Sequence, residues 1–95
     1  MKIFVDIDET ICNSNPSFYE NAIPILDNIK KINKLYEQKH TIIYWTARGI
    51  LDKKDYFKLT KDQLDSWGCL YHEVRFGKPY FDLMIDDKAK RIEEL

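Results

Sequence analysis

The chain has 95 residues, of which 44% are hydrophobic and 14% aromatic, so its composition excludes a disordered or low-complexity protein. This length suits one compact core, and we expect a single domain over residues 1–95 with no room for a large cap domain. The 15 basic and 16 acidic residues leave a net charge of -1, which argues against a nucleic-acid partner because a phosphate backbone attracts basic surfaces.

The sequence carries no sign of a membrane segment or of a disulfide framework. No apolar run reaches the roughly 20 residues that cross a bilayer, and the apolar run at residues 2–5 is too short for a secretion signal. Cys12 and Cys69 lack the spacing of a zinc site or of a CxxC pair. We therefore expect a soluble cytoplasmic protein with two reduced thiols and no membrane partner.

A short strand is predicted near the start of the chain. Ile3, Phe4 and Val5 are apolar and favour β-structure, and the run stops at Asp6 and Asp8. A strand of this kind is typical of a parallel sheet that is buried on both faces.

Helices and strands then alternate along the chain. Apolar residues recur at helical spacing from about residue 22 to 36, and the β-branched and aromatic run 41–45 predicts a second buried strand that ends at Thr46. A weaker helical pattern covers about 55–67, and a short strand is expected around 70–74.

The C-terminal part is predicted to hold one more strand and one more helix. Residues 76–79 have the Gly and Pro of a turn, and the apolar run 83–85 predicts a strand that ends at Asp86 and Asp87. Residues 88–95 are expected to form the last helix. The alternation predicts an α/β fold with a mostly parallel sheet of about four strands.

Polar residues follow three of the four predicted strands. Asp6 and Asp8 follow the first, Thr46 the second, and Asp86 and Asp87 the last. Because ligands bind at the carboxyl ends of parallel strands, we expect these side chains to share one site. Several carboxylates at one sheet edge repel one another unless a cation lies between them. Carboxylate oxygens suit Mg²⁺, which keeps positions open for a substrate phosphate.

Four segments in this order resemble the motifs of the haloacid dehalogenase superfamily. Residues 6–10, Asp-Ile-Asp-Glu-Thr, are similar to the DxDxT motif, and Thr46, Lys78 and the pair Asp86–Asp87 match the second, third and fourth motifs. The resemblance implies a minimal three-layer sandwich without a cap. It also implies a magnesium-dependent phosphatase that forms an aspartyl phosphate.

The resemblance assigns a role to each of these residues. Asp6 is the expected nucleophile and Asp8 the expected general acid and base. Thr46 is expected to donate a hydrogen bond to the phosphoryl group, and Lys78 to neutralise charge on Asp6 and on that group. Residues Ala47 and Arg48 belong to the expected phosphate-binding loop, and Arg48 is further expected to contact an anionic group of the substrate or to lie exposed in the loop.

The same resemblance implies a set of metal ligands. Mg²⁺ would be held by a side-chain oxygen of Asp6, the backbone carbonyl of Asp8, and Asp86 or Asp87, of which we favour Asp87. The sequence alone leaves open whether Mn²⁺ takes its place. It also leaves open that one of the last two aspartates caps the final helix, which is an ordinary use of Asp.

The substrate and the partners are less well defined by the sequence. Residues 77–79 with 82–89 resemble small phosphatase-like proteins of bacterial polysaccharide and capsule synthesis, which implies a phosphosugar or another small phosphate ester. An uncovered site leads us to hypothesise a homo-oligomer. Phosphotransfer to another hydroxyl group and a catalytically silent module that binds phospho-ligands or proteins are the alternatives. Lys88 is the alternative to Lys78.

Overall fold

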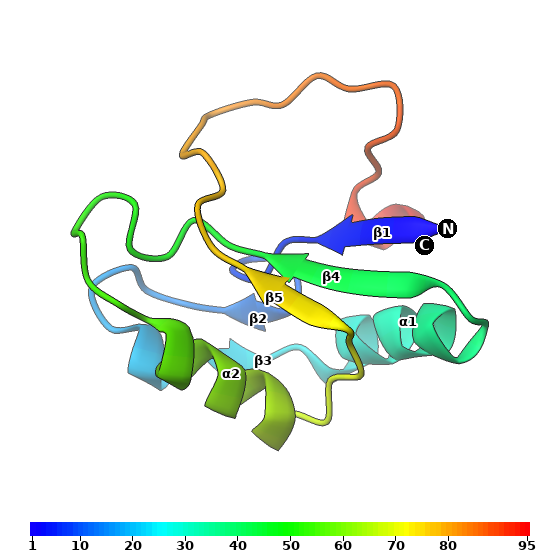
Figure 1. Ribbon diagram of the computed structural model, residues 1–95, viewed down its shortest axis with the longest axis horizontal. Helices are drawn as coiled ribbons and strands as arrows, with labels where there is room; N and C mark the ends of the chain where they lie inside the picture. The colour runs from blue at the N-terminus through cyan, green and yellow to red at the C-terminus, as the bar shows by residue number, and fades with distance from the viewer.

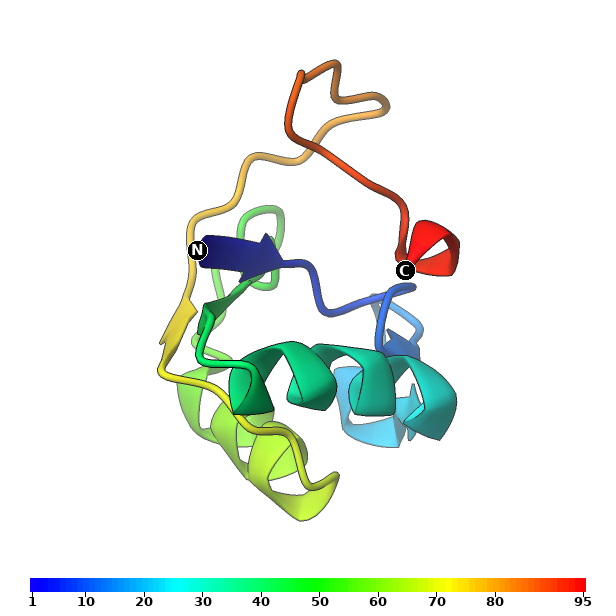
Figure 2. The ribbon, with the colours of Figure 1, turned by 90° about the vertical axis from the view of Figure 1, so that its right-hand side faces the viewer.

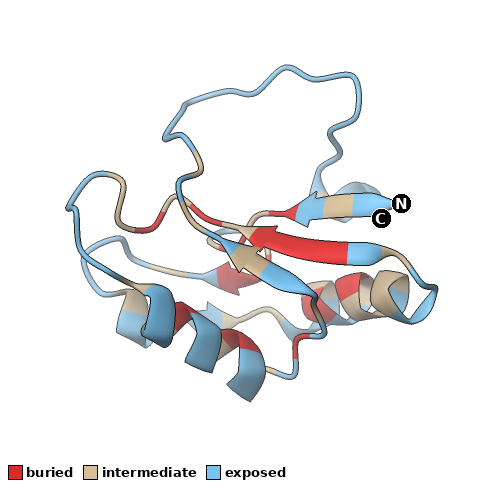
Figure 3. Cartoon of the chain, in the orientation of Figure 1, coloured by how far each residue is buried: buried red, intermediate tan, exposed pale blue.

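The computed structural model describes all residues from 1 to 95, and its centre is a parallel sheet of three strands. The sheet order is β1 (Lys2–Val5), β4 (Thr41–Trp45) and β5 (Glu73–Arg75), so β4 lies in the middle (Figure 1). Ile42, Ile43 and Tyr44 are buried on this strand, which Figure 3 shows as the longest buried stretch of the sheet. The α/β class predicted from the sequence is confirmed.

Two helices pack on the same face of this sheet. They are α1 (Leu26–Glu37), which connects β1 to β4 beyond β3, and α2 (Phe57–Ser66), which connects β4 to β5. In the parallel register Ile3 is opposite Ile42 and Val5 is opposite Tyr44, so these four side chains point to one face. The core joins that face to both helices through Val5, Ile7, Ile11, Cys12, Ile29, Ile32, Ile42, Tyr44, Leu64 and Cys69.

The other face of the sheet is not covered by a helix (Figure 2). Phe4 on this face is 43% exposed, and its ring meets the ring of Trp45 edge to face at 5.5 Å between centroids. The guanidinium group of Arg75 lies 5.3 Å from the centroid of the Phe4 ring. The molecule therefore has two layers, one of helices and one sheet. The prediction of a three-layer sandwich is wrong because α1 and α2 both pack on the opposite face of the sheet.

The segment between β1 and α1 forms a small structure of its own. Strands β2 (Cys12–Asn13) and β3 (Ile23–Pro24) pair antiparallel, with the short helix η1 (Tyr19–Asn21) between them. This segment is too small to cover the sheet edge where the predicted site lies. The predicted absence of a cap is confirmed.

The predicted strand at 83–85 and the predicted helix at 88–95 do not form. Residues 76–91 make a long excursion without regular structure, drawn in orange in Figure 1, and only η2 (Ile92–Glu94) follows. Leu83 is 76% exposed and Ile85 is 91% exposed. The sheet has three strands instead of about four, because this apolar run makes no backbone pairing with β1.

The chain end returns to the body of the molecule. Ile92 packs against the core, and its carbonyl oxygen accepts a hydrogen bond from Lys31 Nζ of α1 at 3.4 Å. No helix in the structure combines the length and the apolar character needed to cross a bilayer. Both cysteines are free and buried.

Candidate active site

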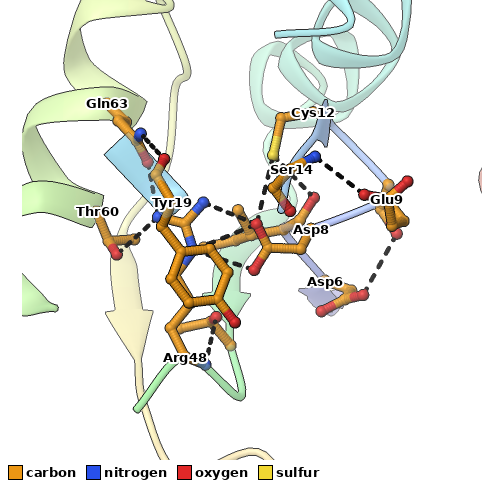
Figure 4. A network of polar contacts seen from close by, with 12 residues as sticks. Asp6, Asp8, Glu9, Cys12, Ser14, Tyr19, Arg48, Thr60 and Gln63 are labelled. Atoms are coloured by element: carbon orange, nitrogen blue, oxygen red, sulfur yellow. Dashed lines mark hydrogen bonds and ion pairs between the residues drawn. The ribbon is translucent and has the colours of Figure 1, made fainter. Parts of the chain in front are cut away.

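Asp6 and Asp8 lie together at the carboxyl end of β1. Ile7 between them is fully buried, whereas the side chains of Asp6 and Asp8 remain partly exposed. The chain then turns tightly: the amide of Ile11 donates to the carbonyl of Ile7 at 2.9 Å, and Glu9 adopts a left-handed conformation with φ of 63°. This turn holds both carboxylates at the edge of the sheet (Figure 4).

Asp6 is paired with the lysine that the third motif predicts. Lys78 Nζ lies 3.2 Å from Asp6 Oδ1, and the side chains are 14% and 37% exposed. Thr10 Oγ1 donates to Asp6 Oδ2 at 3.5 Å. Lys78 reaches this position because its amide donates to the carbonyl of Thr46 at 3.1 Å, which ties the turn after β5 to the end of β4.

Thr46 is buried at the end of β4, next to the same edge of the sheet. Its amide donates to the carbonyl of Arg75 at 2.9 Å, and its Oγ1 accepts a hydrogen bond from the amide of Arg48 at 3.1 Å. The hydroxyl oxygen therefore already has a donor, and its own proton is free to be donated. The structure thus places Asp6, Asp8, Thr46 and Lys78 at one edge of the sheet.

Arg48 does not lie where a substrate contact requires it. Its side chain is completely shielded from solvent and forms an ion pair with Asp8, Nη2 to Oδ1 at 2.8 Å. Nε also donates to Asp8 Oδ2 at 3.0 Å, and Nη1 donates to Thr60 Oγ1 at 3.0 Å and to Gln63 Oε1 at 2.6 Å. The predicted contact with an anionic group of the substrate is wrong, because protein partners surround the guanidinium group.

Three further residues complete this network, and the sequence reasoning did not assign them to the site. Thr60 and Gln63 of α2 bind Arg48, and the ring of Tyr19 lies 4.7 Å from the guanidinium carbon. Gln63 Nε2 donates to the carbonyl of Tyr19 at 2.7 Å. The sequence signal for them was weak: Thr60 and Gln63 are polar residues three positions apart in a predicted helix, and Gln63 precedes the apolar Leu64. Burial raises the pKa of Tyr19, and the nearby charge of Asp8 adds to this rise.

Cys12 also borders Asp8, but its chemistry excludes a nucleophilic role. Cys12 Sγ lies 3.6 Å from Asp8 Oδ1 and is buried. Burial, followed by the charge of Asp8, raises the pKa of the Cys12 thiol to about 12. A thiol with such a pKa holds little thiolate near neutral pH, so Cys12 acts as a packing group and a weak donor.

An open cleft adjoins this edge of the sheet. It is formed by the loop after β4, the start of η1 and the segment after Lys78, through Pro16, Tyr19, Ala47, Gly49, Leu51, Asp52 and Tyr80. Ala47 follows Thr46 directly, so the cleft begins next to the four predicted catalytic residues. Its lining is mainly apolar and aromatic, with one carboxylate at Asp52.

Asp86 and Asp87 are not part of this constellation. Both are exposed in the 76–91 segment, and the amide of Lys88 donates to Asp86 Oδ1 at 2.9 Å. That hydrogen bond, followed by one with Asp87, lowers the pKa of Asp86. No group of three or more acidic, histidine or cysteine side chains is arranged so that it could hold a metal ion. Oxygen ligands suit Mg²⁺, yet this arrangement assembles only Asp6 and Asp8 of the four predicted ligands.

Comparison with known proteins finds one informative similarity. No family model and no curated protein matches the chain. Among solved structures, the chain is similar to a structural-genomics target from Vibrio cholerae, with 29% sequence identity and a TM-score of 0.89. The match covers 98% of this chain and 85% of that chain. The shared architecture therefore extends over almost the whole molecule, and the similarity assigns no activity.

Proposed function

We propose that this protein is a magnesium-dependent phosphatase of the haloacid dehalogenase type, which hydrolyses a small phosphate monoester through an aspartyl phosphate on Asp6. The observation that carries the proposal is the contact between Asp6 and Lys78, 3.2 Å apart, at the end of the strand that also presents Asp8. An anionic phosphate can approach the partly exposed carboxylate of Asp6, because the positive charge of Lys78 offsets the repulsion between the two anions.

The proposed reaction has two steps at the same phosphorus atom. A carboxylate oxygen of Asp6 attacks phosphorus, the bond from phosphorus to the ester oxygen breaks, and Asp8 gives that oxygen a proton. Asp8 then takes a proton from a water molecule that attacks the acyl phosphate. Inorganic phosphate leaves, and the Asp6 carboxylate is restored.

Thr46, Ala47 and Lys78 are proposed to bind the phosphoryl group. The Thr46 hydroxyl has a proton to donate, and Lys78 lies against the nucleophile. A backbone amide of the loop that begins at Ala47 would add a third donor. Hydrogen bonds to charged oxygens are stronger than neutral ones, so three donors suffice to orient a transferring group.

Mg²⁺ remains part of the proposal, although only two of its expected ligands lie together. It would be held by a side-chain oxygen of Asp6, the backbone carbonyl of Asp8, and Asp86 or Asp87, of which the last two lie in the exposed 76–91 segment. When bound, the ion supplies positive charge that offsets the repulsion between phosphate and carboxylate. Mn²⁺ would serve the same purpose.

The substrate is proposed to be a small ester, with a phosphosugar of cytoplasmic polysaccharide or capsule synthesis as the leading class. The cleft beside Ala47 supports this proposal, because aromatic rings such as Tyr19 and Tyr80 pack well against sugar rings. The carboxylate of Asp52 disfavours substrates with a second anionic group at that end.

The experiment that tests the proposed function is phosphate release from phosphosugars, nucleotides and an activated aryl phosphate. Each substrate is measured with Mg²⁺ and with EDTA, for the natural protein, Asp6→Asn, and the exposed helix variant Asp27→Asn as a matched control. We expect metal-dependent release that Asp6→Asn loses and Asp27→Asn keeps. Activity retained in Asp6→Asn would exclude Asp6 as the nucleophile.

One alternative is supported by a specific observation. A silent module that binds phospho-ligands would also be expected to have the ion pair between Asp8 and Arg48 and to lack an assembled group of metal ligands. No release from any substrate by folded, metal-replete protein would favour that module. Transfer of phosphate to an added alcohol, instead of water, would indicate the phosphotransferase.

A further inference from the structure

The side chain of Arg48 holds the carboxylate of Asp8 at both oxygens. Nη2 donates to Oδ1 at 2.8 Å and Nε donates to Oδ2 at 3.0 Å, with a longer contact from Nε to Oδ1 at 3.3 Å. Arg48 is completely shielded, whereas the side chain of Asp8 is 23% exposed. In this ion pair, drawn in Figure 4, the guanidinium group is therefore buried and the carboxylate is partly open to solvent.

Arg48 is itself fixed by side chains from α2. Its Nη1 donates to Thr60 and to Gln63, and Gln63 in turn holds the backbone of Tyr19, whose ring lies over the guanidinium group. Four of the five N–H groups of an arginine are thus used, and its planar geometry leaves little freedom at Nε and Nη2. The position of Asp8 is consequently set by α2 and not only by its own turn.

We propose that Arg48 is a positioning residue that orients Asp8 for proton transfer to the leaving oxygen of the substrate. This inference rests on the proposed function and deepens it. Because the side chain of Arg48 is completely shielded and bound by protein groups, it acts on the substrate only through Asp8. Misplacing a catalytic group by about 1 Å can lower a rate about 10²-fold, which makes such an anchor important.

Two substrates with different leaving groups distinguish positioning from a general structural role. An activated aryl phosphate releases a stable phenolate and needs little protonation, whereas an alkyl phosphate needs its leaving oxygen protonated. Because kcat/KM covers only the steps up to leaving-group release, it reports the acid role of Asp8 without its later role as base.

The central variant is Arg48→Lys, which keeps one positive charge but loses the two-pronged contact. We expect kcat/KM for the alkyl phosphate to fall about tenfold or more relative to kcat/KM for the aryl phosphate. In an Asp8→Asn background, the same substitution should have no further selective effect on the alkyl substrate, because the group that Arg48 positions is already gone.

A second variant keeps the test decisive if Arg48→Lys does not fold. Thr60→Val removes one anchor of Nη1 and leaves the contacts between Arg48 and Asp8 in place. It should shift the same ratio in the same direction by a smaller factor. Arg91→Lys, at an exposed arginine paired with Glu93, is the matched control and should leave the ratio unchanged.

The outcomes separate this inference from the proposed function. Natural protein that hydrolyses neither substrate contradicts the proposed function and the inference with it. Natural protein that hydrolyses both, together with Arg48 and Thr60 variants that lower both values of kcat/KM by the same factor, overturns the positioning role alone. A selective loss on the alkyl substrate in folded variants supports it.

Discussion

Asp8 has both a proposed catalytic role and a structural role as the charged partner of the buried Arg48. Its carboxylate faces solvent on one side and the fully shielded Arg48 on the other. Removing its charge therefore has two separate consequences, one for turnover and one for stability. Each consequence can be measured independently of the other.

We expect Asp8→Asn to accumulate phosphoenzyme with an activated aryl phosphate, because the attacking water loses its base while the first step needs little acid. Rapid-quench measurement should show a burst of phenolate followed by slow turnover. The variant should also lose roughly 2 kcal/mol in the free energy of unfolding, because a buried guanidinium loses its charged partner. Full steady-state activity would remove Asp8 from the mechanism.

Titration of the buried thiols predicts how stability depends on pH. Burial raises the pKa of Cys12 to about 12 and that of Cys69 to about 11. The unfolded chain loses these protons from about pH 8.5, where the folded chain keeps them. Stability from these thiols is therefore fully present below that pH and is lost as pH rises through 11 and 12.

The measurement for this prediction is urea denaturation between about pH 7 and about pH 10. Each thiol can lower the free energy of unfolding by up to about 1.4 kcal/mol per pH unit in the window above its unfolded pKa. A double variant, Cys12→Ala with Cys69→Ala, should show a flatter dependence, although Tyr44, whose pKa burial also raises, contributes with the same sign. Equal slopes in the two proteins would contradict the prediction.

Sequence reasoning predicted most of the candidate site but misjudged the environment of Arg48. Asp6, Asp8 and Thr46 are predicted at one end of the sheet because parallel strands share their carboxyl ends, and Lys78 is predicted there from the motif resemblance; the structure brings these four together. Asp86 and Asp87, predicted at the same end, lie instead in the exposed 76–91 segment. The expectation for Arg48 was wrong because an arginine in a loop is usually exposed. Its burial depends on Thr60 and Gln63 of α2, and a helical pattern does not show where such residues pack.

The loop after β4 is the element on which the cleft and Thr46 both depend. Gly49 in this loop has φ of 88°, and a Cβ atom there would lie 2.4 Å from the carbonyl oxygen of Lys54. Gly68 also has a positive φ, of 76°, but a Cβ there would meet no atom within 4 Å. Both glycines have a left-handed backbone in which a side chain would be strained, and they differ in the space around them.

We expect Gly49→Ala to lower kcat/KM of the proposed activity about tenfold, because the loop must move away from Lys54 and carries the phosphate-binding backbone with it. Gly68→Ala is the matched control and should lose only about 1 kcal/mol of stability, with unchanged kcat/KM. Phosphatase assays and urea denaturation of both variants provide the comparison. An equal effect of the two substitutions on kcat/KM would contradict the role of the loop.

The accuracy of the predicted elements follows the strength of their patterns. Helices α1 and α2 and strands β1 and β4 form close to their predicted ranges, because a long amphipathic pattern or a β-branched run such as 41–45 specifies its element strongly. Strand β5 overlaps only the end of the predicted strand 70–74, and the pair β2 and β3 was not predicted. The run 83–85 is as short as the run 3–5 that forms β1, but its residues Leu83 and Ile85 remain exposed and pair with no strand. An apolar run of this length does not by itself specify whether it joins the sheet. The helix expected at 88–95 is too short to form without packing, and only Ile92 contacts the core.

At the scale of the whole molecule, the sheet is open in two respects. Its second face carries a half-exposed Phe4 and is covered by no helix, and β1 and β5 are both edge strands. The 76–91 segment adds further exposed apolar side chains at Tyr80, Phe81, Leu83, Met84 and Ile85. Exposed strand edges and contiguous apolar surface both favour association with another chain.

We therefore expect sedimentation equilibrium to show self-association at micromolar concentrations. Phe4 lies on the uncovered face, next to Trp45 and Arg75, so Phe4→Lys should place an unpaired charge in the contact and yield monomers. Leu26→Lys, at a 58% exposed position on α1, is the matched control and should associate like the natural protein. Monomeric natural protein at all concentrations, with full phosphatase activity, would show that neither the open sheet face nor the uncovered site needs a second copy.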